Sequence, residues 1–236
     1  MRVRRPAEAI IGALLLALSA APARAAAPDV IVYGDPPLTH ALRDVARRFT
    51  AQTGVPVHVF AAPPSLLLAQ LRHQVWNDVV VTLAPWMDRA VQAGVIAPAT
   101  RTGSWRTTLV IAAATGGGDT LAIPDPTPAS GIDGPSVIAA AGLHPARVQG
   151  VANGANVAFL LDTGAAAQGL LHLTELRADP RLHVVAPVPE AAYAPIVYDA
   201  ALSTLTHSPN ARAFLDYLHA PAATATLRED GLEAVP

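Results

Sequence analysis

The sequence contains no cysteine and no lysine, and the absence of cysteine excludes several kinds of site. Without cysteine, the chain has no disulfide framework, no thiolate metal site and no cysteine nucleophile. Its basic residues are all arginines, and beyond the N-terminus they form no dense run. Because nucleic-acid binding needs a basic stripe or patch, we predict no nucleic-acid partner.

Charged residues are also scarce, whereas apolar residues are abundant. Charged residues make up 14% of the 236 residues and hydrophobic residues 52%, with a formal net charge of −2. A chain of this length buries a sizeable core, as one large domain or as two small lobes. The positive mean hydropathy partly reflects alanine and is weak evidence for a membrane protein.

The first 25 residues have the features of an export signal. "MRVRR" is basic, "AIIGALLLALSAA" is apolar, and Ala23-Arg24-Ala25 fits the small-x-small pattern of a cleavage site. An uncleaved membrane anchor is the alternative, although the apolar run is short for a span. We predict cleavage after Ala25 and a periplasmic location. Cleavage removes four arginines and one glutamate, which brings the net charge to about −5.

Segments typical of strands and helices alternate through the first half of the remaining chain. The expected elements cover residues 30–34, 38–54, 55–61, 65–74, 78–84 and 86–96. Gly54 has the place of a helix C′ residue, and Ser65 that of an N-cap. This β-α-β-α-β-α order predicts a parallel sheet covered by helices.

The second half continues the alternation and returns toward the first. Strands are expected over residues 107–114, 119–126, 147–152, 169–173, 182–189 and 195–204. Helices are expected from about 135, over 156–168 and over 210–220, and a last one from 221 stops at Gly231. We therefore predict an α/β protein of two lobes with chain crossovers between them. Lobe 1 comprises residues 26–106 plus 199–236, and lobe 2 comprises residues 107–198.

Several segments carry a resemblance to a known family. They are "WMDRAVQAGVI" after the strand "DVVVTLA", then "SLLLAQL", the "DP" of "LAIPDP", and "ARAFLDYL" with its following "AP". In this order they resemble periplasmic molybdate-binding proteins, the soluble receptors of molybdate ABC importers. The resemblance implies a two-lobed type II periplasmic-binding-protein fold with a ligand cleft between the lobes. It also implies a monomer without cofactor or enzymatic activity, which binds a small molecule or oxyanion and delivers it to an inner-membrane ABC permease.

The same resemblance suggests where the ligand binds. The family holds an oxyanion without a counter-cation, through hydroxyls and backbone N–H groups at helix N-termini, where the helix dipole favours an anion. The family's two serines fall on Pro37 and Pro64, and its tyrosine falls on His172. The candidate ligand-binding residues are Asp35, Pro37, Pro64, Ser65, Ser130, Asn153, Gly154 and His172.

The two prolines change the expected chemistry of this site. Each replaces a residue that would offer a hydroxyl and an N–H group, and losing a desolvated donor typically costs about 1–3 kcal/mol. Asp35 adds a negative charge beside the first turn. By resemblance we predict a receptor for a molybdate- or tungstate-type oxyanion with an altered pocket. The alternatives are a receptor for a different small solute, such as an organic acid or another anion, and a ligand sensor that does not transport.

Structural explanations compete with these functional ones. Proline fits the first turn of a helix, aspartate most often serves there as an N-cap, and a histidine on an apolar strand is usually a satisfied core residue. We favour the capping role for Asp35. For His172 and for the proline pairs, the structural and the ligand-related explanations carry similar weight.

Two further classes of site have little support in the sequence. No pair of the eight histidines has HxxxH or HxH spacing, so we predict no metal site. An exported hydrolase is the least favoured function, because the chain has no GxSxG motif and a pairing of Ser65 with His172 would be arbitrary.

Overall fold

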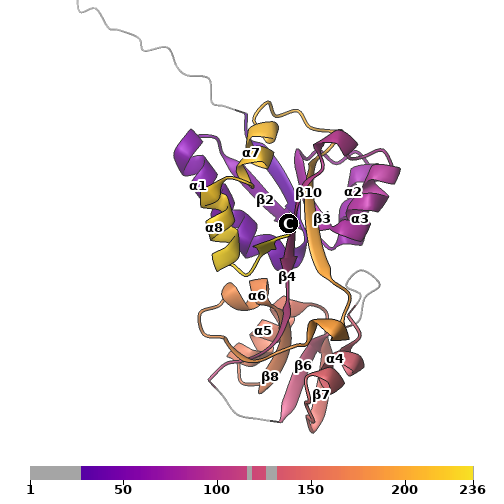
Figure 1. Ribbon diagram of the computed structural model, residues 1–236, viewed down its shortest axis with the longest axis vertical. Coiled ribbons are helices and arrows are strands. Elements are labelled where there is room, and N and C mark those ends of the chain that lie inside the picture. The colour runs from indigo at the N-terminus through magenta and orange to yellow at the C-terminus, as the bar shows by residue number, and fades with distance from the viewer. Residues whose placement is uncertain (1–27, 116–118, 126–131, 236) are drawn as a thin grey trace, which may run out of the picture.

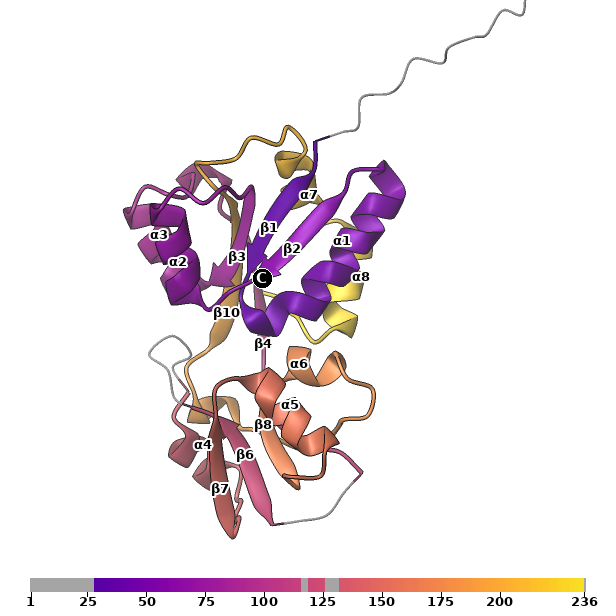
Figure 2. The same cartoon turned by 180° about the vertical axis from the view of Figure 1, so that it is seen from behind.

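The computed structural model describes residues 28–115, 119–125 and 132–235, and its ribbon forms two lobes joined by two crossing segments (Figures 1 and 2). Each lobe is built on its own sheet, of six strands in one and five in the other. The export signal expected over residues 1–25 and the candidate residue Ser130 lie outside the described residues. Within the described part, no helix is long and apolar enough to cross a membrane.

The first sheet combines a parallel core with antiparallel strands. Its strands are β1 (Val30–Gly34), β2 (Val57–Ala61), β3 (Val79–Leu83), β4 (Thr102–Thr107), β10 (Ile196–Leu202) and β11 (Glu233–Ala234). Strand β1 runs parallel to β2 and β3, as predicted from the βαβ order. Strand β10 is antiparallel to β3 and β4, and β11 is antiparallel to β4, so the sheet is mixed.

Helices cover both faces of this sheet. They are α1 (Thr39–Thr53), α2 (Pro64–Arg72), α3 (Ala84–Gln92), α7 (Ala211–Tyr217) and α8 (Pro221–Glu229), with the short 3-10 helices η1 (Pro36–Leu38) and η2 (Pro98–Thr100). Val79 and Val81 pack on the face covered by α1, α7 and α8, and Val80 packs on the face covered by α2 and α3. The continuous apolar run of β3 is thus explained by burial on both faces.

The second sheet has the same mixed character. Its elements are β5 (Leu109–Ala113), β6 (Thr120–Pro124), α4 (Gly134–Ala140), β7 (Arg147–Val151), α5 (Gly154–Asp162), β8 (Gln168–His172), α6 (Leu173–Arg177), β9 (His183–Pro187) and the 3-10 helix η3 (Glu190–Ala192). Strand β6 is parallel to β7 and β8, while β5 is antiparallel to β8 and β9. Helices α5 and α6 pack on one face, and α4 packs on the other.

The chain crosses between the sheets twice, and the two crossings are hydrogen-bonded to each other. The first runs from β4 directly into β5, and the second runs from β9 through η3 into β10. Leu109 N–H donates to the Tyr193 hydroxyl at 3.1 Å, and Val188 N–H donates to the Leu109 carbonyl at 3.1 Å. Two paired connections are the arrangement implied by the family resemblance. The predicted residue limits of the lobes stay a prediction.

Helix boundaries test the expected caps. Gly54 closes α1 with a φ of 74°, which confirms its predicted place. Ser65 does not begin α2, because the helix starts at Pro64 and Pro63 holds the N-cap position. The prediction for Ser65 as a cap is therefore wrong. A proline at N1 with its φ already fixed starts the helix one residue earlier.

Candidate functional site

A cavity of about 150 Å³ lies between the lobes and is lined by residues of both. The six-stranded sheet and its helices contribute the turn after β1, the start of α2 and the side chains of Leu83, Ile196 and Tyr198. The five-stranded sheet and its helices contribute the ends of β6 and β8 and the start of α5. Ligands of α/β proteins bind at the carboxyl ends of parallel strands, where this cavity is placed.

Five of the residues that line the cavity are prolines, which have no N–H group. A pair of prolines lies at the start of η1 and another at the start of α2, and both pairs line the cavity. Pro36 is the first residue of η1, and Pro64 is the first residue of α2. The proline residues that line the cavity are Pro36, Pro37, Pro63, Pro64 and Pro124. Helix starts that would otherwise present donors to an anion here present ring carbons.

Asp35 is buried at the cavity and does not cap the helix, so the favoured prediction for this residue is wrong. An N-cap accepts from the N–H of N2 or N3. Pro37 has no N–H, and Leu38 N–H already donates to the Asp35 carbonyl at 2.9 Å. The carboxyl instead accepts from the Thr82 hydroxyl at 2.7 Å and from Leu83 N–H at 3.0 Å, which ties the end of β1 to the end of β3.

Burial changes the acidity of this carboxyl. The Asp35 residue is 2% exposed, and burial raises its pKa from 3.8 to about 7, against the opposing effects of the bonds from Thr82 and Leu83 and the nearby charge of His172. Asp35 therefore exchanges a proton near neutral pH.

On the opposite lobe, His172 pairs with a second carboxyl group. The Nδ1 atom of His172 lies 2.9 Å from Glu175 Oε2, and the same oxygen accepts from His172 N–H at 3.0 Å. Burial would raise the pKa of Glu175, but the charge and hydrogen bonds of His172 outweigh it and hold this pKa below its ordinary value. The His172 side chain is thus a pocket residue with a defined partner rather than a histidine enclosed in the core.

The same glutamate lies against the start of α5. Asn153 caps this helix by accepting from Asn156 N–H at 3.0 Å. A Cβ atom added to Gly154 would come within 2.1 Å of a Glu175 carboxylate oxygen, so only glycine permits this approach. The protein's own carboxylate therefore lies at the helix end where the dipole favours an anion.

Most of the candidate ligand residues come together. Six of them line the cavity: Asp35, Pro37, Pro64, Asn153, Gly154 and His172. Ser65 is exposed and is not part of the lining. Ser130 lies among the residues that are not described.

Sequence reasoning missed three polar lining residues, Asp125, Glu175 and Tyr198. Glu175 had a usable signal, because it follows His172 by three residues in a capping box at the start of α6. Tyr198 had none, since it is a fully buried aromatic on β10. Burial and the charges of Asp35 and Glu175 raise its pKa well above the ordinary value.

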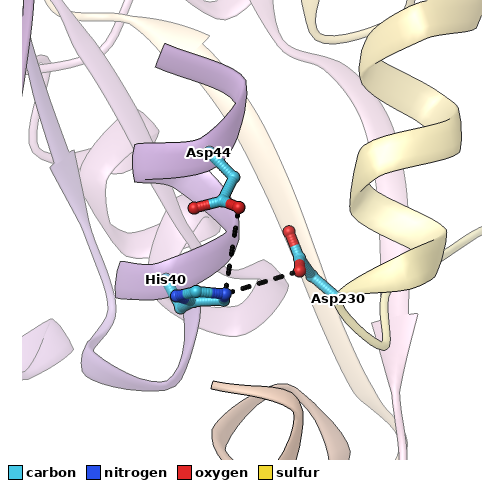
Figure 3. A group of neighbouring side chains, drawn as sticks. All are labelled: His40, Asp44 and Asp230. Atoms are coloured by element: carbon cyan, nitrogen blue, oxygen red, sulfur yellow. Dashed lines mark ion pairs between the residues drawn. The ribbon is translucent and has the colours of Figure 1, made fainter. Parts of the chain in front are cut away.

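A second cluster of polar side chains lies outside this cavity (Figure 3). His40 and Asp44 on α1 approach Asp230, the residue that follows α8, and one ligand atom from each lies within 4.8 Å of the others. Spacing between histidines along the sequence does not reveal this set, because it consists of one histidine and two aspartates, one of them far along the chain.

The chain belongs to the family of bacterial extracellular solute-binding proteins, whose sequence profile matches residues 30–233. The family assignment agrees with the two mixed sheets, the paired crossings and the cavity between the lobes.

Known proteins with this fold differ in what they bind. The periplasmic molybdate-binding protein of Azotobacter vinelandii superposes with a TM-score of 0.75 at 20% identity, covering 88% of this chain and 100% of that one. Iron-bound HitA from Pseudomonas aeruginosa gives 0.56 at 15% identity, covering 86% and 84%. A relative from Pseudomonas sp. named aconitate isomerase is 25% identical over 96% of this chain and 95% of its own length. The resemblance to molybdate-binding proteins is thereby confirmed for the fold.

Proposed function

We propose that this protein is the periplasmic receptor of an ABC importer, and that its cleft takes a small polar organic solute rather than a molybdate-type oxyanion. The importer's inner-membrane permease would receive the solute from it. The observation that carries the proposal is the chemistry of the cavity wall. Proline rings line the two turns where, by the family resemblance, an oxyanion receptor would present hydroxyls and N–H groups, and three carboxyl groups line the same cavity.

A fully deprotonated oxyanion offers only acceptors and negative charge. In this cavity it would meet the carboxyl groups of Asp35, Asp125 and Glu175, and no arginine is among the described residues that line the walls. Like charges brought together in a poorly solvated site repel strongly. Asp35 offers a proton to donate only in its neutral form.

A small organic solute matches the same walls better. Its hydroxyl, amino or protonated carboxyl groups would donate to the carboxylates. Its carbon skeleton would contact the prolines, Ile132 and Ile196. An organic acid that binds with one carboxyl group protonated belongs to this class.

A thermal-denaturation screen tests the proposal. The panel contains molybdate, tungstate, sulfate and phosphate on one side, and small hydroxy acids, amino acids and polyols on the other. A ligand at 100 times its Kd should stabilise the protein by about 2.7 kcal/mol. We expect stabilisation by an organic solute and none by the oxyanions. Micromolar binding of molybdate to the unaltered protein would overturn the proposal.

Restoring the lost donors gives a matched test of the wall chemistry. Pro37→Ser with Pro64→Ser returns two hydroxyls and two N–H groups to the cavity and should raise molybdate affinity about tenfold or more. Pro98→Ser, at the first position of η2 and outside the cavity lining, is the control and should change nothing. If the double variant and Pro98→Ser change molybdate affinity equally, the cavity prolines do not determine which ligand is bound.

A second candidate function is proton-transfer isomerisation. Asp35 combines burial in the cavity with a pKa of about 7, and a group that gains and loses a proton near neutral pH suits general acid–base catalysis. The similarity to a relative named aconitate isomerase extends over nearly the whole chain. Interconversion of aconitate isomers, followed by proton NMR and abolished in Asp35→Asn, would establish this activity. If the unaltered protein does not turn over aconitate, the isomerase candidate is rejected and the receptor proposal remains.

A further inference from the structure

The cluster of His40, Asp44 and Asp230 joins two helices that lie side by side in lobe 1 (Figures 1 and 3). His40 and Asp44 are one turn apart on α1, so their side chains share one face of that helix. Asp230 lies at the C-terminal end of α8. Figure 3 shows the three side chains directed toward one another across the gap between the helices.

The separations within the cluster are too long for direct hydrogen bonds. His40 Nε2 lies 3.9 Å from Asp44 Oδ2 and 3.7 Å from Asp230 Oδ1. The pair of His58 and Asp29 shows the contrast, with a ring nitrogen 2.7 Å from a carboxylate oxygen. The imidazole of His40 is therefore positioned between two carboxylates without bonding to either.

Asp230 has an acceptor that the protein itself does not use. The residue is 8% exposed, and its buried Oδ2 atom accepts no hydrogen bond within the described structure. A buried carboxylate oxygen without a partner is costly, so such an atom requires an explanation. Asp44 is better supplied, because Arg47 donates to its Oδ1 at 2.6 Å and leaves Oδ2 facing His40.

We propose that His40, Asp44 and Asp230 bind one divalent transition-metal ion of the zinc class, which links α1 to the end of α8. Zinc accepts imidazole nitrogen at about 2.0–2.1 Å and carboxylate oxygen at about 2.0–2.2 Å. Ligand atoms around such an ion stand about 3–3.5 Å apart, so the three side chains need to close in only slightly. The imidazole favours zinc over magnesium or calcium, which prefer oxygen ligands.

Binding to the metal-free full-length chain tests the proposal directly. Protein dialysed against a chelator and then titrated with zinc chloride in a calorimeter should bind one equivalent tightly. His40→Ala should weaken that binding by at least about tenfold. Asp230→Asn, which keeps the shape of the side chain, should also weaken it. His58→Ala removes a histidine of a two-residue pair and is the matched control, which should bind zinc as the unaltered protein does.

Cobalt substitution supplies a second readout. Bound cobalt(II) should give visible absorption bands that saturate at one equivalent and disappear in His40→Ala. The proposal is overturned if His40→Ala and Asp230→Asn both still bind one equivalent of zinc as the unaltered protein does. An equal loss in His58→Ala would also overturn it, because it would show nonspecific binding to surface histidines.

Discussion

Each lobe places one carboxyl group on the cleft, Asp35 buried and Glu175 partly buried, and their pKa values are shifted in opposite directions. Asp35 of lobe 1 is held by neutral donors, the Thr82 hydroxyl and Leu83 N–H, and its pKa is raised to about 7. Glu175 of lobe 2 is held by His172, and its pKa is lowered. Burial acts on both in the same direction, so the charge of the partner decides the protonation state.

The same comparison applies to stability. Asp35 has a folded-state pKa above its ordinary value, so its stabilisation is fully present below pH 3.8 and is lost as the pH rises toward about 7. Glu175 has a lowered pKa, so its stabilisation is present above pH 4.5 and is lost as the pH falls. Asp35 thus stabilises the folded protein more at the acidic end of this pH range, and Glu175 stabilises it more at the neutral end.

The largest expected effect comes from removing the ionisation of Asp35. Asp35→Asn keeps one acceptor oxygen, for either the Thr82 hydroxyl or Leu83 N–H, and cannot take up a charge. The free energy of unfolding of the unaltered protein, relative to this variant, should fall by about 3 kcal/mol between pH 4 and pH 7. Urea denaturation at a series of pH values measures the difference. Asp125→Asn, an exposed carboxyl on the same cavity, is the control, and a flat difference for Asp35→Asn would contradict the prediction.

The next effect comes from removing the partner of Glu175. His172→Ala leaves a mostly buried carboxylate without its hydrogen-bond partner, which should lower the free energy of unfolding at pH 7 by about 2 kcal/mol. This value allows for the remaining exposure of the two side chains, 12% and 15%. Adding Glu175→Gln removes the stranded charge and should restore most of the loss. A double variant that is less stable than His172→Ala would refute the charge explanation.

The smallest effect concerns the glycine between Glu175 and α5. In the unaltered protein, Gly154→Ala drives a methyl group into the Glu175 carboxylate and should destabilise by about 1 kcal/mol. In a Glu175→Ala background the clash is gone, and the higher helix propensity of alanine should make the same change neutral or stabilising. Thermal denaturation of the four proteins measures the reversal of sign. If Gly154→Ala changes the stability in the same direction in both backgrounds, Glu175 is not the reason for the glycine.

Local patterns predicted most of the fold. The apolar runs of β1 and β3 and the helix-ending Gly54 depend on neighbouring residues only, and the structure confirms them. Strand β4 was not predicted, because its polar sequence "TGSWRT" becomes a strand through pairing with β10 and β11, which lie far along the chain. The five-residue α6 is too short to show a helical period.

The sequence predicted which turns line the cavity between the lobes, but not the hydrogen bonds that the candidate residues make. The family resemblance located both proline turns and His172, all of which line one cavity. The role of Asp35 could not be obtained in this way, because the donors to its carboxyl oxygens, Thr82 and Leu83, lie 47 and 48 positions further along the chain. The pairing of Asp230 with His40 likewise depends on how α8 packs on α1.

The exposed side chain of Ser65 stands one residue beyond Pro64, outside a cavity that Pro64 lines. Because the natural chain has no thiol, Ser65→Cys would create a single attachment point for an environment-sensitive fluorophore at the rim. A dye held there would report on the contents of the cleft without disturbing its walls, which turns an unused serine into a means of reading out solute binding.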